Sequence, residues 1–513
     1  MRDWSAARVA EAAGASLIAV PTAPGARAAT AASSAATAAP GPAGATIDSR
    51  TVSPGELFVG LPGERTDGGE HALEALRAGA WGVLVSPQHA AATAAAAAAA
   101  LDLPPTATAT APAPVAGRPD VGAVLAHADP LAALQALALV WRRELGASGA
   151  KVVGITGSTG KTSTKDILAA LAATQRVVAS SPENRNTEIG LPLAVLAAPA
   201  GTEVLVLEMA MRGSGQIAEL AAIAEPDVGV IVNVGPVHLE LLGTVEAIAA
   251  AKAELIATMA AGSTVVLPAD EPLLTPYLRA DLKTITFGEN ADVVLREARS
   301  DGQVLIGAHG REIALRPSFA QAHNLLNLLA AVAAALALGI DPQGSLDVRF
   351  SALRGERREL PGGVVVIDDC YNANPMSMRA AIDDLVQTAP ARRVAVLGDM
   401  LELGSQAPRL HREIGLYATE RGVDVLVTVG PLAAEMRVEF AGESYPAGDA
   451  QAAAELLATL LQDGDTVLVK ASRGVGLELV AQKLAGERGG EHDRARGGSG
   501  SGSVTAGGDC ERR

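Results

Sequence analysis

The sequence has few of the features that would place it outside a reducing, aqueous compartment. Its two cysteines, Cys370 and Cys510, lie far apart, so no disulfide framework is expected. The N-terminal stretch has an acidic residue at position 3 and no clean apolar core, which argues against a signal peptide. The alanine-rich run over residues 91–103 is too short to span a bilayer. We therefore expect a cytoplasmic protein that does not bind a membrane.

Positive charge is also scarce. The 41 Lys and Arg residues are outnumbered by 57 Asp and Glu, and the net charge is −16. No basic face is indicated, so nucleic acid is not an expected partner, and we expect a monomer. A protein this acidic must place its few cations locally if it binds phosphate. Aromatic residues make up only 2% of the chain, which reflects an alanine-rich composition more than a function.

The length and the apolar runs predict an α/β protein of three domains. From Asp129 onward, strand-like runs alternate with helical stretches, which is typical of parallel sheets in α/β layers. We predict a small α/β N-terminal domain at 1–125, a central P-loop parallel-sheet domain at 126–340 and a Rossmann-like C-terminal domain at 341–486. Proline- and alanine-rich insertions are expected at 29–46 and 104–120, a hinge at 338–346, and a disordered tail at 487–513.

The segment TGSTGKT at 156–162 predicts a phosphate-binding loop. It follows an apolar run and precedes a helix, so backbone N–H groups and the helix N-terminus would face an anion. Lys161 would reach the terminal phosphates, and Thr162 could ligate magnesium. The strict pattern would have glycine at 155, where Ile155 stands. A bare glycine-rich turn is the alternative, but the strand, loop, Lys-Thr pair and helix all occur in order.

Other polar residues follow the ends of the predicted strands, where ligands bind in open parallel sheets. Glu208 could hold magnesium, although an acid at a helix start would look the same. His238 is a lone histidine, which taken alone is more often a structural side chain. Lys252 lies in a plain helical stretch and taken alone would be a solvated surface lysine. The strand ends of two sheets therefore carry the candidate site residues.

Taken together, these segments resemble the Mur ligase family, the ATP-dependent amide-forming enzymes of peptidoglycan precursor synthesis. The resemblance covers about residues 47–486, and the ordered set is more specific than any single motif. Within the family, three segments resemble the members that add D-alanyl-D-alanine to UDP-N-acetylmuramoyl-tripeptide: NRNTEIGLPL, DDCYNANPMSM and GDMLELG. The resemblance implies that ATP phosphorylates the peptide carboxylate to an acyl phosphate, which the amine of the dipeptide then attacks.

The resemblance also assigns residues to ATP and magnesium. The phosphates would be held by Gly157, Ser158, Thr159, Gly160, Lys161 and Thr162. Glu208 would complete a magnesium site with Thr162, His238 would bind a second magnesium, and Lys252 would match the family's carbamylated lysine. Asn324 would face the adenine and Asp369 the ribose. The catalytic set would then be Lys161, His238, Lys252 and Arg357.

The two other substrates are assigned in the same way. The sugar nucleotide would meet Asp48, Ser49, Arg50, Asn184, Asn186 and Glu188. Asn372 and Asn374 of the YNANP segment are further substrate-binding candidates, and Lys470, Ser472 and Arg473 could hold the carboxylate of the dipeptide.

Some positions depart from the family pattern or stay open. Cys370 stands where Ser is frequent, and Ala471 where Gly is frequent. Around the phosphate-binding arginine the sequence reads Arg354-Gly-Glu-Arg-Arg358; we favour Arg357, with Arg354 and Arg358 open. No roles follow for Asp399, Glu402 and His411.

Three other functions remain as alternatives. A folate polyglutamyl ligase or another Mur ligase would share the central domain, and only the YNANP and DSR segments discriminate. A P-loop kinase or motor ATPase would need no metal-bridging lysine at 252. A binding protein that has lost catalysis is the last alternative, but no key residue is missing from the sequence.

Overall fold

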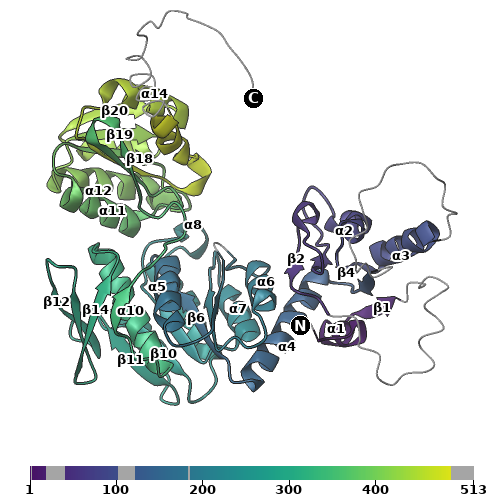
Figure 1. Ribbon diagram of the computed structural model, residues 1–513. Coiled ribbons are helices and arrows are strands. Elements are labelled where there is room, and N and C mark those ends of the chain that lie inside the picture. The colour runs from purple at the N-terminus through teal and green to yellow at the C-terminus, as the bar shows by residue number, and fades with distance from the viewer. Residues whose placement is uncertain (2, 19–40, 102–121, 183–184, 487–513) are drawn as a thin grey trace, which may run out of the picture. The chain divides into compact units, whose positions relative to one another are not determined.

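The computed structural model describes residues 1, 3–18, 41–101, 122–182 and 185–486, which form three separate β-sheets (Figure 1). Apart from β15 and the end of β5, each sheet lies within one predicted domain, and the α/β, three-domain fold is confirmed. The chain forms two compact units: the first combines Met1–Val234 with Glu246–Arg349, and the second combines Gly235–Val245 with the chain from Phe350 onward. The predicted tail at 487–513, the insertion at 104–120 and residues 29–40 lie outside the described residues.

The N-terminal sheet has five strands in the order β1-β5-β4-β3-β2, with β1 antiparallel to β5 and the other neighbours parallel. Its strands are β1 (Ser16–Ile18), β2 (Ala45–Thr46), β3 (Leu57–Val59), β4 (Gly82–Val85) and β5 (Ala123–Ala126). Its helices are α1 (Ala6–Ala12), α2 (Ala72–Arg77) and α3 (Pro87–Leu101). Phe58, Val83 and Val124 are fully buried in its core, so the short strands are held by apolar packing.

The central sheet has ten strands in the order β15-β14-β13-β12-β11-β10-β9-β6-β8-β7. The parallel strands are β6 (Lys151–Thr156), β7 (Val178–Ser180), β8 (Val204–Glu208), β9 (Val228–Ile231), β10 (Thr264–Pro268) and β11 (Lys283–Phe287). The sheet continues with β12 (Val293–Ala298), β13 (Val304–Ala308), β14 (Arg311–Pro317) and β15 (Gly344–Leu346). Because β6 lies between β8 and β9, the carboxyl ends of these three strands are adjacent.

Helices on the central sheet explain its continuous apolar strands, because a parallel sheet covered on both faces has no polar side. They are α4 (Pro130–Ala147), α5 (Lys161–Ala173), α6 (Gly190–Ala197), α7 (Gln216–Ala224), α9 (Val245–Thr258) and α10 (Ala322–Ala337). The apolar runs predicted at the sequence level correspond to β6, β8, β9 and β10, which are buried at nearly every position.

The boundary between the two units differs from the predicted one. After α10 ends at Ala337, β15 pairs in parallel with β14, opposing Gly344 to Leu315. Residues 341–349 thus cluster with the first unit, whereas the sequence placed the boundary at residue 340; the hinge at 338–346 stays a prediction. A three-residue strand that pairs with a distant partner carries no periodicity from which it could be recognised.

The C-terminal sheet has six strands in the order β16-β17-β21-β18-β19-β20, parallel except for β16. They are β16 (Glu356–Leu360), β17 (Val364–Asp368), β18 (Arg393–Gly398), β19 (Val425–Val429), β20 (Glu443–Ala447) and β21 (Thr466–Lys470). The helices of this unit are α8 (Leu239–Leu242), α11 (Pro375–Thr388), α12 (Ala407–Glu420), α13 (Met436–Glu439) and α14 (Ala450–Leu460). The carboxyl ends of β17, β21 and β18 are neighbours, as the strand-end pattern predicted.

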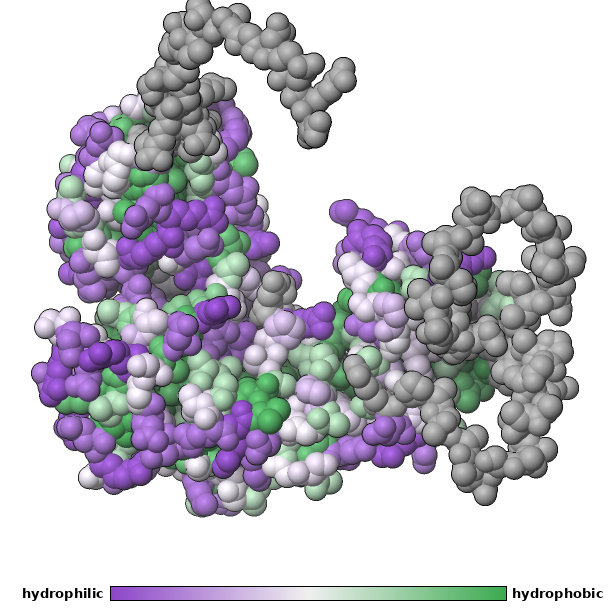
Figure 2. All heavy atoms as spheres, viewed as in Figure 1, coloured by the Kyte–Doolittle hydropathy of each residue, from purple (hydrophilic) through white to green (hydrophobic). Residues whose placement is uncertain are grey.

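The described helices are all too short or too polar to cross a lipid bilayer. Figure 2 shows hydrophilic residues mixed with smaller hydrophobic groups on the visible face of each unit. Apolar atoms on the surface of a folded protein are ordinary when they are scattered in this way.

Arg142 stabilises the first unit through hydrogen bonds to the end of α7. Its side chain, 9% exposed, donates from Nε to the Ala224 carbonyl at 2.7 Å and from an Nη to the Glu225 carbonyl, so it caps the end of α7. Arg142→Met should lower the free energy of unfolding by about 2–3 kcal/mol, because these carbonyls lose a charged donor.

Arg143→Met is the matched control, because Arg143 forms only an exposed ion pair with Glu225 and should cost under about 1 kcal/mol. Denaturant unfolding followed by tryptophan fluorescence checks this. All three tryptophans, Trp4, Trp81 and Trp141, lie in the first unit, so the signal reports on that unit alone. Equal losses for the two variants would contradict the capping role.

Candidate active site

The predicted phosphate loop joins β6 to α5 as the sequence indicated. Gly160 caps the helix in the left-handed conformation, with φ of 75°. A Cβ atom at Gly160 would lie 2.3 Å from Oδ1 of Asn327, so a side chain is excluded by both conformation and space. Lys161 Nζ donates to the Gly157 carbonyl at 2.8 Å, which folds the lysine back over the loop. This arrangement is suited to holding an anion at a helix N-terminus.

Asn233, which follows β9, fixes the shape of this loop. Its Oδ1 accepts from the Thr159 backbone N–H at 2.9 Å, and its Nδ2 donates to Thr159 Oγ1 at 2.9 Å. The Ser158 backbone N–H donates to the Asn233 carbonyl at 3.2 Å. Asn233 is not among the site residues predicted from the sequence. The signal that could have identified Asn233 is its position just after the apolar run that forms β9, the strand next to β6.

Glu208 lies at the end of β8 and is brought against the loop. Thr162 Oγ1 donates to Glu208 Oε2 at 2.7 Å, and both residues are buried. Asn186 Nδ2 donates to the other carboxylate oxygen at 2.9 Å. A buried hydroxyl and carboxylate are hard oxygen donors of the kind that magnesium prefers, so this pair fits the predicted metal. The alternative of an ordinary helix-start acid does not describe a side chain that is held by two other segments.

Lys252 lies on α9 and is 2% exposed, so the alternative of a solvated surface lysine is wrong. Within the described part of the chain, its ammonium has no hydrogen-bond or ion-pair partner. Burial, with a further contribution from the charge of Lys161, lowers the pKa of Lys252 well below its ordinary value. Lys165 is equally buried, but it donates to the Ser181 carbonyl at 2.8 Å and pairs with Asp166. Lys252 is thus a buried amine that favours the neutral form.

The remaining candidates of the first unit are more scattered. Asn324 is buried on α10 and accepts from Asn327, the residue against Gly160, at 3.3 Å. Glu188 is exposed, and Asn184 lies outside the described residues. In the N-terminal domain, Arg50 pairs with Asp48 at 2.7 Å, and these hydrogen bonds lower the pKa of Asp48 to about 2. Ser49 begins the short helical turn that Asp48 caps.

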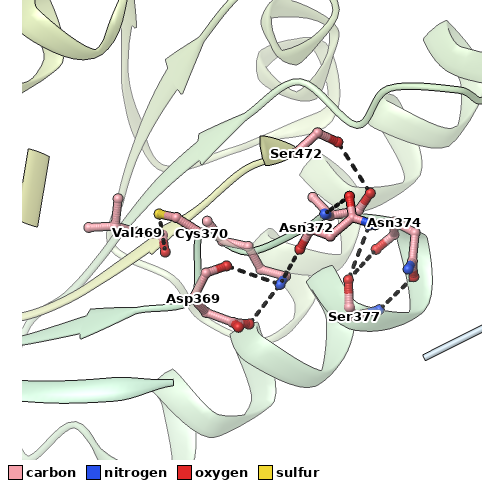
Figure 3. Close-up of polar contacts among 9 residues, drawn as sticks. Asp369, Cys370, Asn372, Asn374, Ser377, Val469 and Ser472 are labelled. Carbon is pink, nitrogen blue, oxygen red and sulfur yellow. Dashed lines mark hydrogen bonds and ion pairs between the residues drawn. The ribbon is translucent and has the colours of Figure 1, made fainter. Parts of the chain in front are cut away.

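In the second unit, Lys470 holds the segment that follows β17 through hydrogen bonds to Asp369 and Asn372; Figure 3 labels both of these residues. Its ammonium donates to Asp369 Oδ2 at 2.6 Å and to the Asn372 carbonyl at 2.9 Å, and the residue is 2% exposed. Lys470 thus fixes the backbone of the YNANP segment, and its ammonium is paired with the carboxylate of Asp369. The predicted contacts of Lys470 with a dipeptide and of Asp369 with a ribose stay predictions.

Asn374 has a local role that its sequence also explains. Its Oδ1 accepts from the Ser377 N–H at 3.0 Å, and Ser377 Oγ accepts from the Asn374 N–H at 3.1 Å (Figure 3). This is a capping box at the start of α11, followed by Pro375 at the first helical position. The Asn374 amide is therefore engaged by the helix, whereas the Asn372 side chain accepts only from the next backbone N–H.

The four candidate arginines of the second unit, Arg354, Arg357, Arg358 and Arg473, differ in their partners. Arg357 pairs with Asp384 at 2.7 Å and contacts the Thr388 hydroxyl at 2.9 Å. Arg358 pairs with Glu356 at 3.1 Å. Arg354 stacks on Tyr371 with its Cζ 4.0 Å from the ring centroid, and its Nε has no hydrogen-bond partner among the residues that the structure describes. Arg473 is exposed just after β21, and no acidic partner is found for it among the described residues.

The GDMLELG segment forms a loop held by three side chains. His411, fully buried, accepts from the Met400 N–H at 2.9 Å and donates from Nδ1 to the Ala407 carbonyl at 2.7 Å. Burial lowers the pKa of His411, in keeping with a neutral ring that both accepts and donates. Ser472 Oγ accepts from the Leu401 N–H at 2.9 Å, and Asp399 accepts from the Ala433 N–H at 2.6 Å.

His238 belongs to the second unit rather than the first. It lies in the segment Gly235–Val245, and its Nδ1 contacts the carboxylate of Glu402 in the GDMLELG loop. The structure therefore groups Lys161, Thr162, Glu208, Lys252 and Asn324 in one unit, and His238, Asp369, Lys470, Ser472 and Arg473 in the other.

Gly160→Ala tests the geometry of the phosphate loop. A left-handed alanine and the overlap with Asn327 should together lower the free energy of unfolding by about 2–4 kcal/mol and weaken ATP binding. Gly213→Ala is the control, because nothing lies within 4 Å of its added Cβ. Calorimetric titration with ATP and thermal unfolding measure both effects. Unchanged affinity and stability in Gly160→Ala would contradict the arrangement.

Three family models match the chain in the order of its sheets. Residues 43–129 match the Mur ligase family catalytic domain, residues 155–335 the Mur ligase middle domain, and residues 353–473 the Mur ligase glutamate ligase domain. Each match covers most of one sheet, with β1 and β15 outside the matched residues.

Individual relatives agree with these models. UDP-N-acetylmuramoyl-tripeptide--D-alanyl-D-alanine ligase of Mycobacterium tuberculosis (strain CDC 1551) is 35% identical, over 86% of this chain and 92% of the relative. The ligase of the same name from Bacillus subtilis is 34% identical, over 86% and 93%. The crystal structure of MurF ligase from Thermotoga maritima in complex with ADP has a TM-score of 0.70 and 31% identity, and covers 87% of this chain and 98% of that one. With its phosphate loop, its buried carboxylate and lysine, and these matches, the chain belongs to the Mur ligase family.

Proposed function

We propose that this protein is the ATP-dependent ligase that joins D-alanyl-D-alanine to UDP-N-acetylmuramoyl-tripeptide in peptidoglycan precursor synthesis. The two curated relatives carry the name of this ligase, and the match extends over both compact units. The observation that carries the proposal is the grouping of Lys161, the Thr162–Glu208 pair and the buried Lys252 in one unit of a Mur ligase. A site of this composition suits transfer of a phosphoryl group to a carboxylate.

Nucleotide binding is supported by the loop and by the relative solved with ADP. The backbone of residues 157–160 and the start of α5 would hold the phosphates, with Lys161 reaching the terminal one. Asn324, beside Asn327 and the loop, is proposed to face the adenine. Thr162 and Glu208 would hold magnesium, which when bound neutralises charge on the phosphates.

The chemistry requires an activated carboxyl group. An oxygen of the peptide's terminal carboxylate attacks the γ-phosphorus of ATP, the bond to ADP breaks, and an acyl phosphate forms. The amine of D-alanyl-D-alanine then attacks the acyl carbon, the C–O bond to phosphate breaks, and the amine gives up a proton as the amide forms. Lys161 would stabilise the negative charge on the transferring group, while the loop fixed by Asn233 positions it.

Lys252 is proposed to carry a carbamate. The neutral amine attacks carbon dioxide and loses a proton, which converts an uncharged buried amine into a carbamate anion able to ligate a metal. Its burial, its missing anionic partner in the described residues and its lowered pKa all favour the reactive neutral form. Lys165 is equally buried, but it is already paired with Asp166 and donates to the Ser181 carbonyl.

The remaining contacts are proposed from placement. Asp48, Ser49, Arg50, Asn184, Asn186 and Glu188 are the residues proposed for the sugar nucleotide. Arg473 is an exposed cation just after β21, so it is better placed for the dipeptide carboxylate than the buried Lys470. Arg357 is proposed for phosphate, which requires it to exchange Asp384 for the nucleotide. We expect a monomer in the cytoplasm, where the sugar nucleotide and ATP are available.

A phosphate-release assay tests which substrates the reaction requires. Phosphate should appear only when ATP, UDP-N-acetylmuramoyl-tripeptide, D-alanyl-D-alanine and magnesium are all present, together with the pentapeptide product by mass spectrometry. Replacing the two peptide substrates with a folate and glutamate should give none. Release without the dipeptide would favour a kinase or ATPase, and release with folate would favour a folate ligase.

If Lys252 carries a carbamate, its carbonyl carbon should be visible by ¹³C NMR. Protein equilibrated with ¹³C-bicarbonate should show a carbamate ¹³C signal that is absent from Lys252→Arg, because a guanidinium stays protonated and does not add carbon dioxide. Lys151→Arg is the matched control, since Lys151 is exposed and paired with Asp227. A signal that persists in Lys252→Arg, or that never appears in the unsubstituted protein, would rule the modification out.

A further inference from the structure

The segment Gly235–Val245 is packed into the second unit, although the strand before it, β9, and the rest of α9 after it belong to the first. Two contacts hold it. A Cβ atom at Gly235 would lie 1.9 Å from the sulfur of Met376, so the backbone presses directly against the start of α11. At the other contact, the Glu240 N–H donates to the Glu402 carbonyl at 3.1 Å. The segment is thus fixed by the two sequences, DDCYNANPM and GDMLELG, that the sequence singled out.

His238 and Glu402 meet in an unusual conformation. Both residues are left-handed, with φ of 52° and 63°, which costs energy for residues other than glycine. Their side chains point at one another, with Nδ1 of His238 on the carboxylate of Glu402. The backbone bond from Glu240 to Glu402 adds a second link beside this pair. The side chains are only partly exposed, at 22% and 39%.

The direction of this contact determines the histidine tautomer. A carboxylate only accepts, so Nδ1 must carry the proton, and a neutral imidazole then has its lone pair on Nε2. Carboxylates that accept from the outer nitrogen of a histidine orient the ring and raise the basicity of the inner nitrogen. The ring is therefore prepared to bind a cation through Nε2.

Glu402 is itself held rigidly. His411 accepts from the Met400 N–H, and Ser472 accepts from the Leu401 N–H, on the two residues just before Glu402. These bonds fix the loop backbone from inside the unit. The GDMLELG loop and Ser472, which are distant in the sequence, together position the Glu402 carboxylate.

We propose that Glu402 is a positioning residue that fixes His238 in the Nδ1–H tautomer and orients its Nε2 toward a divalent cation. The cation part rests on the proposed function, in which His238 binds magnesium; the tautomer part does not. Asp399, His411 and Ser472 support Glu402 by holding its loop. All the residues that orient His238 then belong to the second unit, so that unit determines whether this ligand is ready.

The test uses the full-length protein without metal or substrate. With ¹⁵N-histidine labelling and His238→Gln for assignment, His238 should be the Nδ1–H tautomer in the unsubstituted protein. In Glu402→Leu it should shift to a mixture that contains the Nε2–H form. Glu402→Gln keeps an acceptor oxygen and should retain most of the original tautomer. Glu240→Gln, an exposed carboxylate on the same segment, is the matched control and should change nothing.

Manganese binding, followed by electron paramagnetic resonance with a non-hydrolysable ATP analogue, is the second measurement. Glu402→Leu should weaken one manganese ion by about 10-fold or more and leave the other unchanged, with Glu402→Gln in between. The tautomer and manganese affinity of Glu402→Leu matching those of the unsubstituted protein would overturn the proposal. Should Glu402→Leu not fold, Glu402→Ala takes its place, because it also removes the acceptor oxygen and wild-type tautomer and manganese affinity in it would overturn the proposal.

The two measurements distinguish a failure of the positioning role from a failure of the proposed ligase function. A protein without ligase activity whose His238 still changes tautomer in Glu402→Leu would keep the positioning role and lose the ligase. An active ligase with an unresponsive His238 would keep the function and lose the positioning role.

Discussion

A negative charge at the buried end of a parallel strand is tolerated only when neighbouring groups supply hydrogen bonds or a cation. Glu208 imposes this condition on the first unit. Its carboxylate is satisfied by Thr162 from the phosphate loop and by Asn186 from the segment before α6, and its backbone N–H by Ser181 after β7. Three separate segments are tied to Glu208, two of them through its carboxylate, and the Thr162 hydroxyl that donates to it would also share a metal with it.

The parts that sequence predicted well are local. A phosphate loop is contained in seven consecutive residues, and buried parallel strands read as apolar runs, so β6, α5 and the neighbouring strands follow from short windows. Lys252 could not be placed in this way. Its helix is rich in alanine around the whole circumference, so no polar face marks which side meets the sheet. Its burial depends on packing that no window of the sequence contains.

Long-range pairs account for most of what sequence missed. Asn233 and Thr159, and His238 and Glu402, are distant in the chain and meet only because of strand order and loop docking. Lys470 and Asn374 show the complementary effect. Both stand in segments whose resemblance suggested substrate contacts, yet burial and helix capping give each of them a structural partner. The residue types predicted that these segments belong to the site. The hydrogen-bond partners of each side chain become known only from the folded structure.

The second unit is assembled from two stretches of chain, one of which is inserted between β9 and α9 of the first. A fragment begun at Phe350 would lack residues 235–245, leaving Met376 and the Glu402 loop without the backbone that packs on them. Truncation at the apparent domain border would therefore produce a protein with exposed apolar surface and poor solubility. A circular permutation or a tethered peptide that restores this stretch would be needed to study the C-terminal half in isolation.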